Sequence, residues 1–126
     1  MKEKAPYGSW RSFISASLVA EAASRPGDLV VDGLDIYIGE SRPEESGRVA
    51  IVKLGTGNQA QAEDVHAAPF SARSRVHEYG GGSFNVRAGS LVFVNDSDQA
   101  LYLRGPGERP RRLSPLLVGG QRRFAE

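Results

Sequence analysis

Serines and histidines near glycines are the first candidates for chemistry in this 126-residue chain, because the sequence holds no cysteine. A thiol nucleophile, a disulfide and a zinc–thiolate site are therefore excluded. Gly81-Gly82-Ser83-Phe84-Asn85 comes nearest to the Gly-x-Ser-x-Gly turn that exposes a nucleophilic serine. Asn85 stands where the second glycine is needed, and the residues after Ser83 predict a strand instead of the required helix. We expect no catalytic residue here; an independent hydrolase would need turnover that is lost on Ser83→Ala.

The two histidines, His66 and His77, are the remaining candidates for metal binding or proton transfer. A metal site needs three or four converging ligands, and two histidines eleven positions apart among scattered carboxylates do not show that spacing. We expect no metal and no cofactor. We place His66 on the surface of a connecting segment.

The charge balance argues against nucleic acid and membrane as partners. The chain has 16 basic and 15 acidic residues, so it has no strong overall field. No apolar run approaches the roughly 20 residues that cross a bilayer. Residues 101–126 hold six arginines and two glutamates, but they lack the interleaved aromatics of a nucleic-acid site, so we expect a solvated or interface-seeking tail. No apolar stretch follows the first lysines, which predicts a cytoplasmic protein.

The densest cluster of polar and glycine residues reads Arg-Ser-Arg-Val-His-Glu-Tyr-Gly-Gly-Gly at residues 73–82. We expect the side chains of His77 and Glu78 to hydrogen-bond backbone groups or the guanidinium groups of the nearby arginines, which would fix a crossover between two sheets. The three glycines would supply backbone angles or a close approach that a side chain forbids. The candidate site residues, for this structural role or for controlling substrate access, are Arg73, Arg75, His77, Glu78, Tyr79, Gly80, Gly81 and Gly82.

The elements that position this cluster are one short helix and two sets of strands. Residues 15–24 predict a helix, capped by Ser15 or Ser17 and stopped by Arg25-Pro26-Gly27. Segments rich in Val, Ile, Tyr and Phe, separated by turn residues, predict strands at 28–31, 35–40 and 48–54, and again at 83–87, 90–95 and 100–104.

The two sets of strands can be superposed along the sequence. Gly33 falls on Gly89, 56 positions later, and Ile51 falls on Leu101, 50 positions later. Each copy then ends in a polar segment that holds one apolar residue, Val65 or Leu113, before a proline. Four antiparallel strands in each copy are typical of the blades of a β-propeller.

We therefore predict an all-β fold: two antiparallel four-stranded β-propeller blades, a partial propeller, with a short N-terminal helix. The expected divisions are 1–27 for the arm and helix, 28–82 for the first blade and the connector, and 83–126 for the second blade and the basic tail. The alternative is a small sandwich or barrel of six to eight strands, which uses the same turn chemistry.

Longer motifs give the chain a family resemblance. Ala5-Pro6-Tyr7-Gly8-Ser9-Trp10, Val31-Asp32-Gly33 and above all His77-Glu78-Tyr79-Gly80-Gly81-Gly82 appear in order. From about residue 5 to residue 124, the chain resembles the N-terminal β-propeller region of prolyl oligopeptidase family serine peptidases. The nearest branch is the dipeptidyl aminopeptidase/acylaminoacyl-peptidase type.

This resemblance implies a function and a missing part. In the family, a propeller gates the access of peptides to an α/β-hydrolase domain that holds a Ser, Asp, His triad. Nothing in this sequence matches that domain, so the resemblance implies a non-catalytic fragment or a truncated relative. Some relatives hold the amino terminus of a peptide with propeller carboxylates, and Glu78 is the candidate here.

The expected partners follow from an unclosed propeller. Two blades cannot close a ring, so we expect the chain to bind the remainder of a propeller and a hydrolase domain, or to self-associate through open blade edges. The rival function is a free-standing small β-domain that acts as a protein-binding module. A closed barrel would favour that rival.

Overall fold

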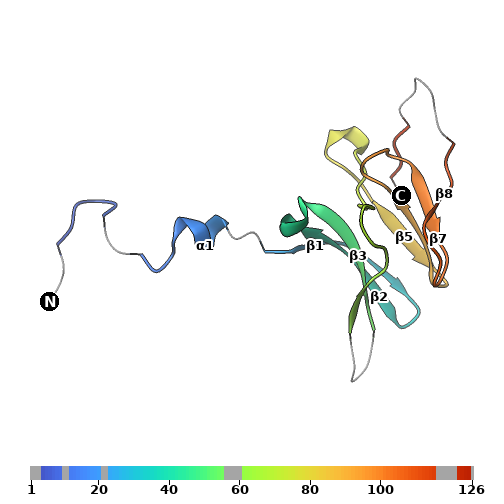
Figure 1. Cartoon of the computed structure of the whole chain (residues 1–126), viewed down its shortest axis with the longest axis horizontal. Coiled ribbons are helices and arrows are strands. Elements are labelled where there is room, and N and C mark those ends of the chain that lie inside the picture. The colour runs from blue at the N-terminus through green and yellow to red at the C-terminus, as the bar shows by residue number, and fades with distance from the viewer. Residues whose placement is uncertain (1–3, 10–11, 21–22, 56–60, 116–121, 126) are drawn as a thin grey trace.

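The computed structural model describes residues 4–9, 12–20, 23–55, 61–115 and 122–125. Within these residues the chain forms two four-stranded antiparallel sheets and one short α-helix, α1 (Ala16–Ala20). The described part of the N-terminal arm extends away from both sheets (Figure 1). None of the helices in the described ranges is long and apolar enough to cross a membrane.

The first sheet has the order β1-β2-β3-β4, and the second has the order β5-β6-β7-β8. The strands of the first are β1 (Arg25–Asp32), β2 (Asp35–Arg42), β3 (Arg48–Leu54) and β4 (Ala62–Asp64). Those of the second are β5 (Phe84–Arg87), β6 (Ser90–Val94), β7 (Leu101–Arg104) and β8 (Arg111–Arg112). Two 3₁₀ turns, η1 (Pro43–Glu45) and η2 (Val76–Glu78), lie in the β2–β3 loop and between the sheets.

The predicted fold class is confirmed by these sheets, and the described residues do not close into a barrel. The turn residues explain the match. Gly33 has a φ of +63° between β1 and β2, while Ala88 and Gly89 have φ values of +50° and +72° between β5 and β6. Two positive φ angles, as at Ala88-Gly89, are the requirement of a type I′ hairpin turn, while a glycine with a positive φ at the first loop position alone, as at Gly33, is typical of type II′.

The boundaries of some elements differ from the prediction. The side chain of Ser15 caps α1 by accepting a hydrogen bond from the N–H of Leu18 at 3.0 Å. The predicted helix reached residue 24, whereas residues 23 and 24 are not helical and β1 begins at Arg25. Arg25 pairs with Ser41, and the register shifts between Pro26 and Leu29. A proline is tolerated there because β1 is an edge strand with one side free of ladder bonds. The divisions at residues 27/28 and 82/83 stay predictions.

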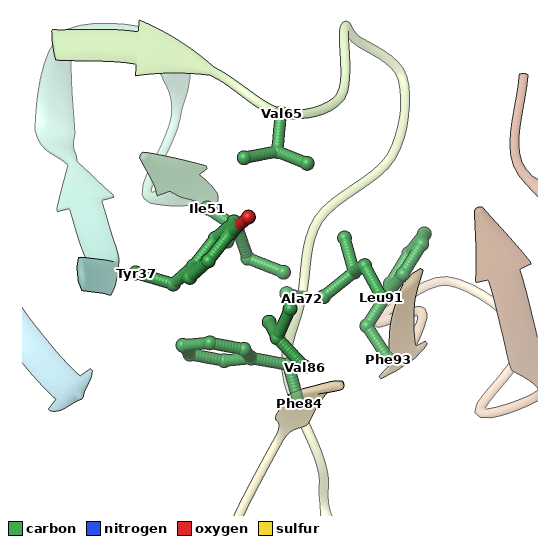
Figure 2. Close-up of a cluster of buried hydrophobic side chains, with 8 residues drawn as sticks. All are labelled: Tyr37, Ile51, Val65, Ala72, Phe84, Val86, Leu91 and Phe93. Carbon is green, nitrogen blue, oxygen red and sulfur yellow. The ribbon is translucent and has the colours of Figure 1, made fainter. Parts of the chain in front are cut away.

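The core lies between the facing surfaces of the two sheets (Figure 2). Tyr37 and Ile51 face it from the first sheet. The segment that connects β4 to β5 adds the side chains of Val65 and Ala72. The second sheet contributes Phe84, Val86, Leu91 and Phe93. Phe93, Ile51 and Leu91 are the largest completely buried side chains among the described residues. Burying side chains of this size stabilises the fold by about 2 kcal/mol each.

His66 is buried, so its predicted surface position is wrong. It is 3% exposed, and its ring stacks on Phe93 with centroids 5.0 Å apart. Phe70 meets both rings edge-on. A histidine in a polar stretch is usually exposed, and here the aromatic side chains of the second sheet draw it inward.

Carboxylates of β1 join the two sheets. Asp28 accepts hydrogen bonds from the N–H and the hydroxyl of Ser83, both at 3.2 Å. The carboxylate of Asp32 accepts hydrogen bonds from the N–H of Ala88 at 3.0 Å and from the N–H of Gly89 at 2.7 Å. Hydrogen bonds to a charged acceptor are each worth roughly 1.5–3 kcal/mol. The turn of the second sheet is thus held by a side chain of the first.

The connecting segment is also bonded to both sheets. The N–H of Ala72 donates to the carbonyl of Val49 at 2.9 Å, and the N–H of Arg73 donates to the carbonyl of Val94 at 3.0 Å. The connector that follows therefore starts from a fixed position between the sheets.

Candidate functional site

The candidate site is the connector, residues 73–82, whose backbone is bent by a run of left-handed conformations. His77 has a φ of +52°, Glu78 of +66° and Gly80 of +97°. The N–H of Glu78 donates to the carbonyl of Arg75 at 3.1 Å, and the N–H of Gly80 donates to the carbonyl of Val76 at 2.9 Å. A side chain in this conformation costs about 1 kcal/mol or more, so His77 and Glu78 hold a conformation that tertiary contacts must support.

Arg75 is held by the β6–β7 loop. Its Nε donates to Oδ1 of Asp96 at 2.9 Å, and its backbone N–H donates to Oε1 of Gln99 at 2.8 Å. Gln99 in turn donates to the carbonyl of Arg73 at 3.1 Å. The expected pairing of Arg73 and Arg75 with His77 and Glu78 is not found among the described residues.

Glu78 has a partner from the C-terminal tail instead. Nη1 of Arg123 donates to the carboxylate of Glu78 and, at 2.7 Å, to the carbonyl of Arg75. Ser74 donates its hydroxyl to the carbonyl of Phe124. Residues 122–125 therefore lie on the connector, although the prediction left the tail solvated or seeking an interface.

Gly81 makes this contact with the tail possible. A Cβ at Gly81 would lie 2.8 Å from the Cβ of Ala125 and 3.0 Å from Cγ1 of Val76. Gly80 likewise approaches the carbonyl of Ser74, at 3.1 Å from a built Cβ. Both glycines thus serve close approach, as the sequence suggested for this run.

His77 and Tyr79 form an exposed aromatic pair. Their rings stack with centroids 5.9 Å apart, and Tyr79 is 88% exposed. Neither ring is packed into the core, so both are available to a ligand or a neighbouring domain.

A cavity of about 660 Å³ lies beside the connector. Its lining comes from the start of β1 and from the connector. It includes Arg25, Gly27, Asp28, Arg73, Ser74, Tyr79, Gly80, Gly81, Gly82 and Ser83. Five of the eight candidate residues therefore line this cavity. The other three, Arg75, His77 and Glu78, lie outside the lining.

Ser83 has a structural role in this hollow. It is 8% exposed, and its hydroxyl donates to Asp28. No hydrogen bond joins it to either histidine within the described ranges. No cluster of three or more His, Cys, Asp or Glu side chains that could hold a metal is found in the part of the chain that the structure describes.

The strongest electrostatic cluster lies elsewhere, on the first sheet. Arg42 donates to both oxygens of Asp64, at 2.7 and 2.6 Å, and also to Glu40 and Glu45. The guanidinium of Arg42 lowers the pKa of the Asp64 carboxyl below its ordinary value. Arg48 closes the network by donating to Glu45 at 2.5 Å. Sequence reasoning missed this network, whose only local signal is the alternation of charges around Pro43.

Comparison with known proteins places this fold in a larger enzyme family. No protein-family model and no curated protein matches the chain. The structure of a puromycin-hydrolyzing peptidase from Mycobacterium tuberculosis matches 94% of the chain at 40% identity and a TM-score of 0.82. The chain is related to the N-terminal region of prolyl oligopeptidase family peptidases.

Two further structures of the family agree. A puromycin hydrolase matches 99% of the chain at 37% identity and a TM-score of 0.78, and a mutant puromycin hydrolase complexed with PGG matches 92% at 37% and 0.75. The chain spans about a fifth of the length of these relatives, between 19% and 20%. The family resemblance predicted from the His77–Gly82 motif is confirmed.

Proposed function

We propose that this chain is part of a propeller that limits which peptides reach the active site of a serine peptidase. The dipeptidyl aminopeptidase/acylaminoacyl-peptidase type is the branch that its motifs suggest. The observation that carries the proposal is the connector, where an exposed Tyr79 and a glycine wall border a hollow between two consecutive blades. A catalytic domain outside this chain, and a cytoplasmic location, belong to the same proposal.

Within the connector, we divide the candidate residues into supporting and substrate-facing groups. Arg75 and Glu78 are engaged by Asp96 and Arg123, so they support the bend. Tyr79 and Arg73 are exposed and line the hollow, so they are the side chains that a passing peptide meets. An amino terminus bound by Glu78 would compete with Arg123 for the carboxylate.

The partner that we propose is another blade of the same propeller, packed on the outer face of the first sheet. Leu29 and Val31 lie on that face and are 58% and 61% exposed. Ile38 and Ile36 are their direct partners in the register, so the four apolar side chains are contiguous. An isolated chain should hide this face by self-association. Light scattering after size-exclusion chromatography should show oligomers that Leu29→Lys disperses; a monomer at every concentration contradicts this.

The function can be tested in a chimera. The matching segment of the Mycobacterium tuberculosis peptidase is replaced by this chain, and hydrolysis is measured on an aminoacyl arylamide and on peptides of increasing length. We expect the chimera to hydrolyse the short substrate and to discriminate against long ones. Tyr79→Ala should raise kcat/KM for long peptides severalfold and leave the arylamide unchanged.

Tyr79→Phe is the matched control, because it keeps the ring at the edge of the hollow and removes only the hydroxyl. It should retain the length preference of the parent chimera. A correctly folded chimera whose length preference is the same with Tyr79 and with alanine would contradict the gating role.

A further inference from the structure

The cavity beside the connector is bordered by two arginines from different parts of the chain. Arg25 is the first residue of β1, and Arg73 is the first residue of the connector. The sequence places them 48 positions apart, and the packing of the two sheets brings them to one hollow of about 660 Å³.

Neither guanidinium has an ion pair or hydrogen bond within the described ranges. Three arginines near the connector and on the first sheet do have a carboxylate partner: Arg42 pairs with Asp64, Arg75 with Asp96, and Arg123 with Glu78. An arginine presents five donors in a planar fork that matches a carboxylate. The two unpaired forks are therefore unused donors at the border of a cavity.

The acidic side chain of the cavity already has hydrogen-bond partners within the chain. Asp28 is the one acidic residue in its lining, and its Oδ2 accepts both the N–H and the hydroxyl of Ser83. Two positive charges thus face one bonded negative charge, which leaves the cavity with an excess of positive charge.

Backbone groups of glycines form part of the lining, and such groups can exchange hydrogen bonds with the backbone of a peptide ligand. Glycines border the hollow on both sides, with Gly27 and Gly39 in the first sheet and Gly80–Gly82 in the connector. At Gly27, Gly39, Gly80 and Gly81 the position of a Cβ already lies close to other atoms of this chain, so these glycines present backbone groups, and no side chains, to the hollow. Tyr79 lies at the border of the cavity and is 88% exposed, so its hydroxyl can form a hydrogen bond with a ligand.

We propose that this cavity binds the carboxylate of a short peptide between Arg25 and Arg73. Binding needs only residues of this chain, so it does not depend on the gating role proposed above. The carboxylate can come from the C-terminus of the peptide or from an acidic side chain, because both offer the same two oxygens to the guanidinium groups.

The proposal is tested by NMR titration of the whole chain with three acetylated peptides. Acetyl-triglycine carries only the terminal carboxylate, its C-terminal amide carries none, and an amidated peptide with one central aspartate carries only a side-chain carboxylate. We expect at least one of the two carboxylate peptides to bind, with a Kd of about 1 mM for such an open site. Their comparison identifies the source. The amide should not bind.

Arg25→Gln and Arg73→Gln should each weaken binding about tenfold, the effect of losing about 1.4 kcal/mol. Both variants should fold, because neither guanidinium has a partner to lose in the described structure. Arg87→Gln is the matched control, since Arg87 is exposed on β5 outside the cavity lining, and it should bind as the parent chain does.

Three results would overturn the proposal. They are equal binding of the amide and the acids, unchanged binding in both cavity variants, and an equal loss in Arg87→Gln, which would indicate attraction to net charge alone. Thermal unfolding of each variant, followed by circular dichroism, verifies that a loss of binding is not a loss of fold.

Discussion

The two sheets share a strand pattern but not a role. Asp28 and Asp32 of the first sheet reach across to the second, whereas the positions 56 residues later hold Phe84 and Ala88. The second sheet supplies buried rings and backbone donors, and the first supplies the carboxylates that bind those donors. The junction is therefore directional, and the two repeats are not interchangeable.

The outer faces differ in the same way. Leu29 and Val31 of the first sheet correspond in the repeat to Asn85 and Arg87 of the second. The first pair is apolar and exposed, while the second pair is polar and exposed. Apolar side chains on an edge strand mark a surface that needs a neighbour, so only the first sheet carries this signal on its first strand.

The largest effect should come from removing a ring of the second sheet. Phe93→Ala deletes a completely buried side chain that stacks on His66 and Tyr102. The expected loss is about 3–5 kcal/mol in the free energy of unfolding, measured by urea denaturation. Leu34→Ala, at an 80% exposed turn position, should change stability by less than about 0.5 kcal/mol. Similar losses in both variants would refute the central place of the Phe93 ring in the core between the sheets.

A second prediction concerns pH. Burial, with a smaller contribution from the charge of Arg48, lowers the pKa of His66 to about 4 from 6.5. The unfolded chain takes up a proton as the pH falls through 6.5, but the folded chain does so only near pH 4. Stability should therefore fall between pH 6.5 and 4, by about 3 kcal/mol in total.

The controls for this pH effect are two histidine variants. His66→Phe should remove the slope between pH 6.5 and 4, while His77→Phe, at an exposed position, should keep it. The lowered pKa of Asp64 gives a separate loss, since stability that depends on its carboxylate disappears as the pH falls through its depressed pKa. Denaturation curves across pH separate the two windows; an unchanged slope in His66→Phe would rule out this histidine as the source.

The smallest effect tests the direction of the junction. Asp32→Ala leaves the N–H groups of Ala88 and Gly89 without their acceptor and should cost about 1–3 kcal/mol. Asp35→Ala removes a surface ion pair with Lys53 at 2.8 Å and should cost less than about 1 kcal/mol. If the two losses measured by denaturation are equal, the carboxylate of Asp32 does not hold the second sheet.

Much of this fold follows from local signals. Gly33 and Gly89 determine tight turns, and the alternating apolar residues on either side determine the strands, so the two sheets could be predicted from neighbours in the sequence. The start of β1 could not, because Arg-Pro-Gly also stops helices. Only the pairing of Arg25 with Ser41, across the sheet, decides between the two structures.

The candidate site was located by its motif but not explained by it. The glycines of residues 80–82 indicated close approach, and the approaching segment proved to be a distant part of the chain: Ala125 lies 44 residues from Gly81, and Arg123 lies 45 residues from Glu78. The burial of His66 was missed for the same reason, since Phe93 lies on another sheet. Partners distant in sequence leave no local pattern that identifies them.

The carboxylate bonds between the sheets also bear on the rate of folding. They join residues 55 to 57 positions apart, so a loop of that length must close before any of them forms, at a cost in chain entropy that local hairpins do not have. Topologies dominated by such distant contacts fold on a scale of about milliseconds to seconds. During synthesis, the hairpins of the first sheet can form before Phe84 and Phe93 have been added to the chain. In this interval the apolar inner face of the first sheet is uncovered, so the nascent chain is then most prone to aggregate.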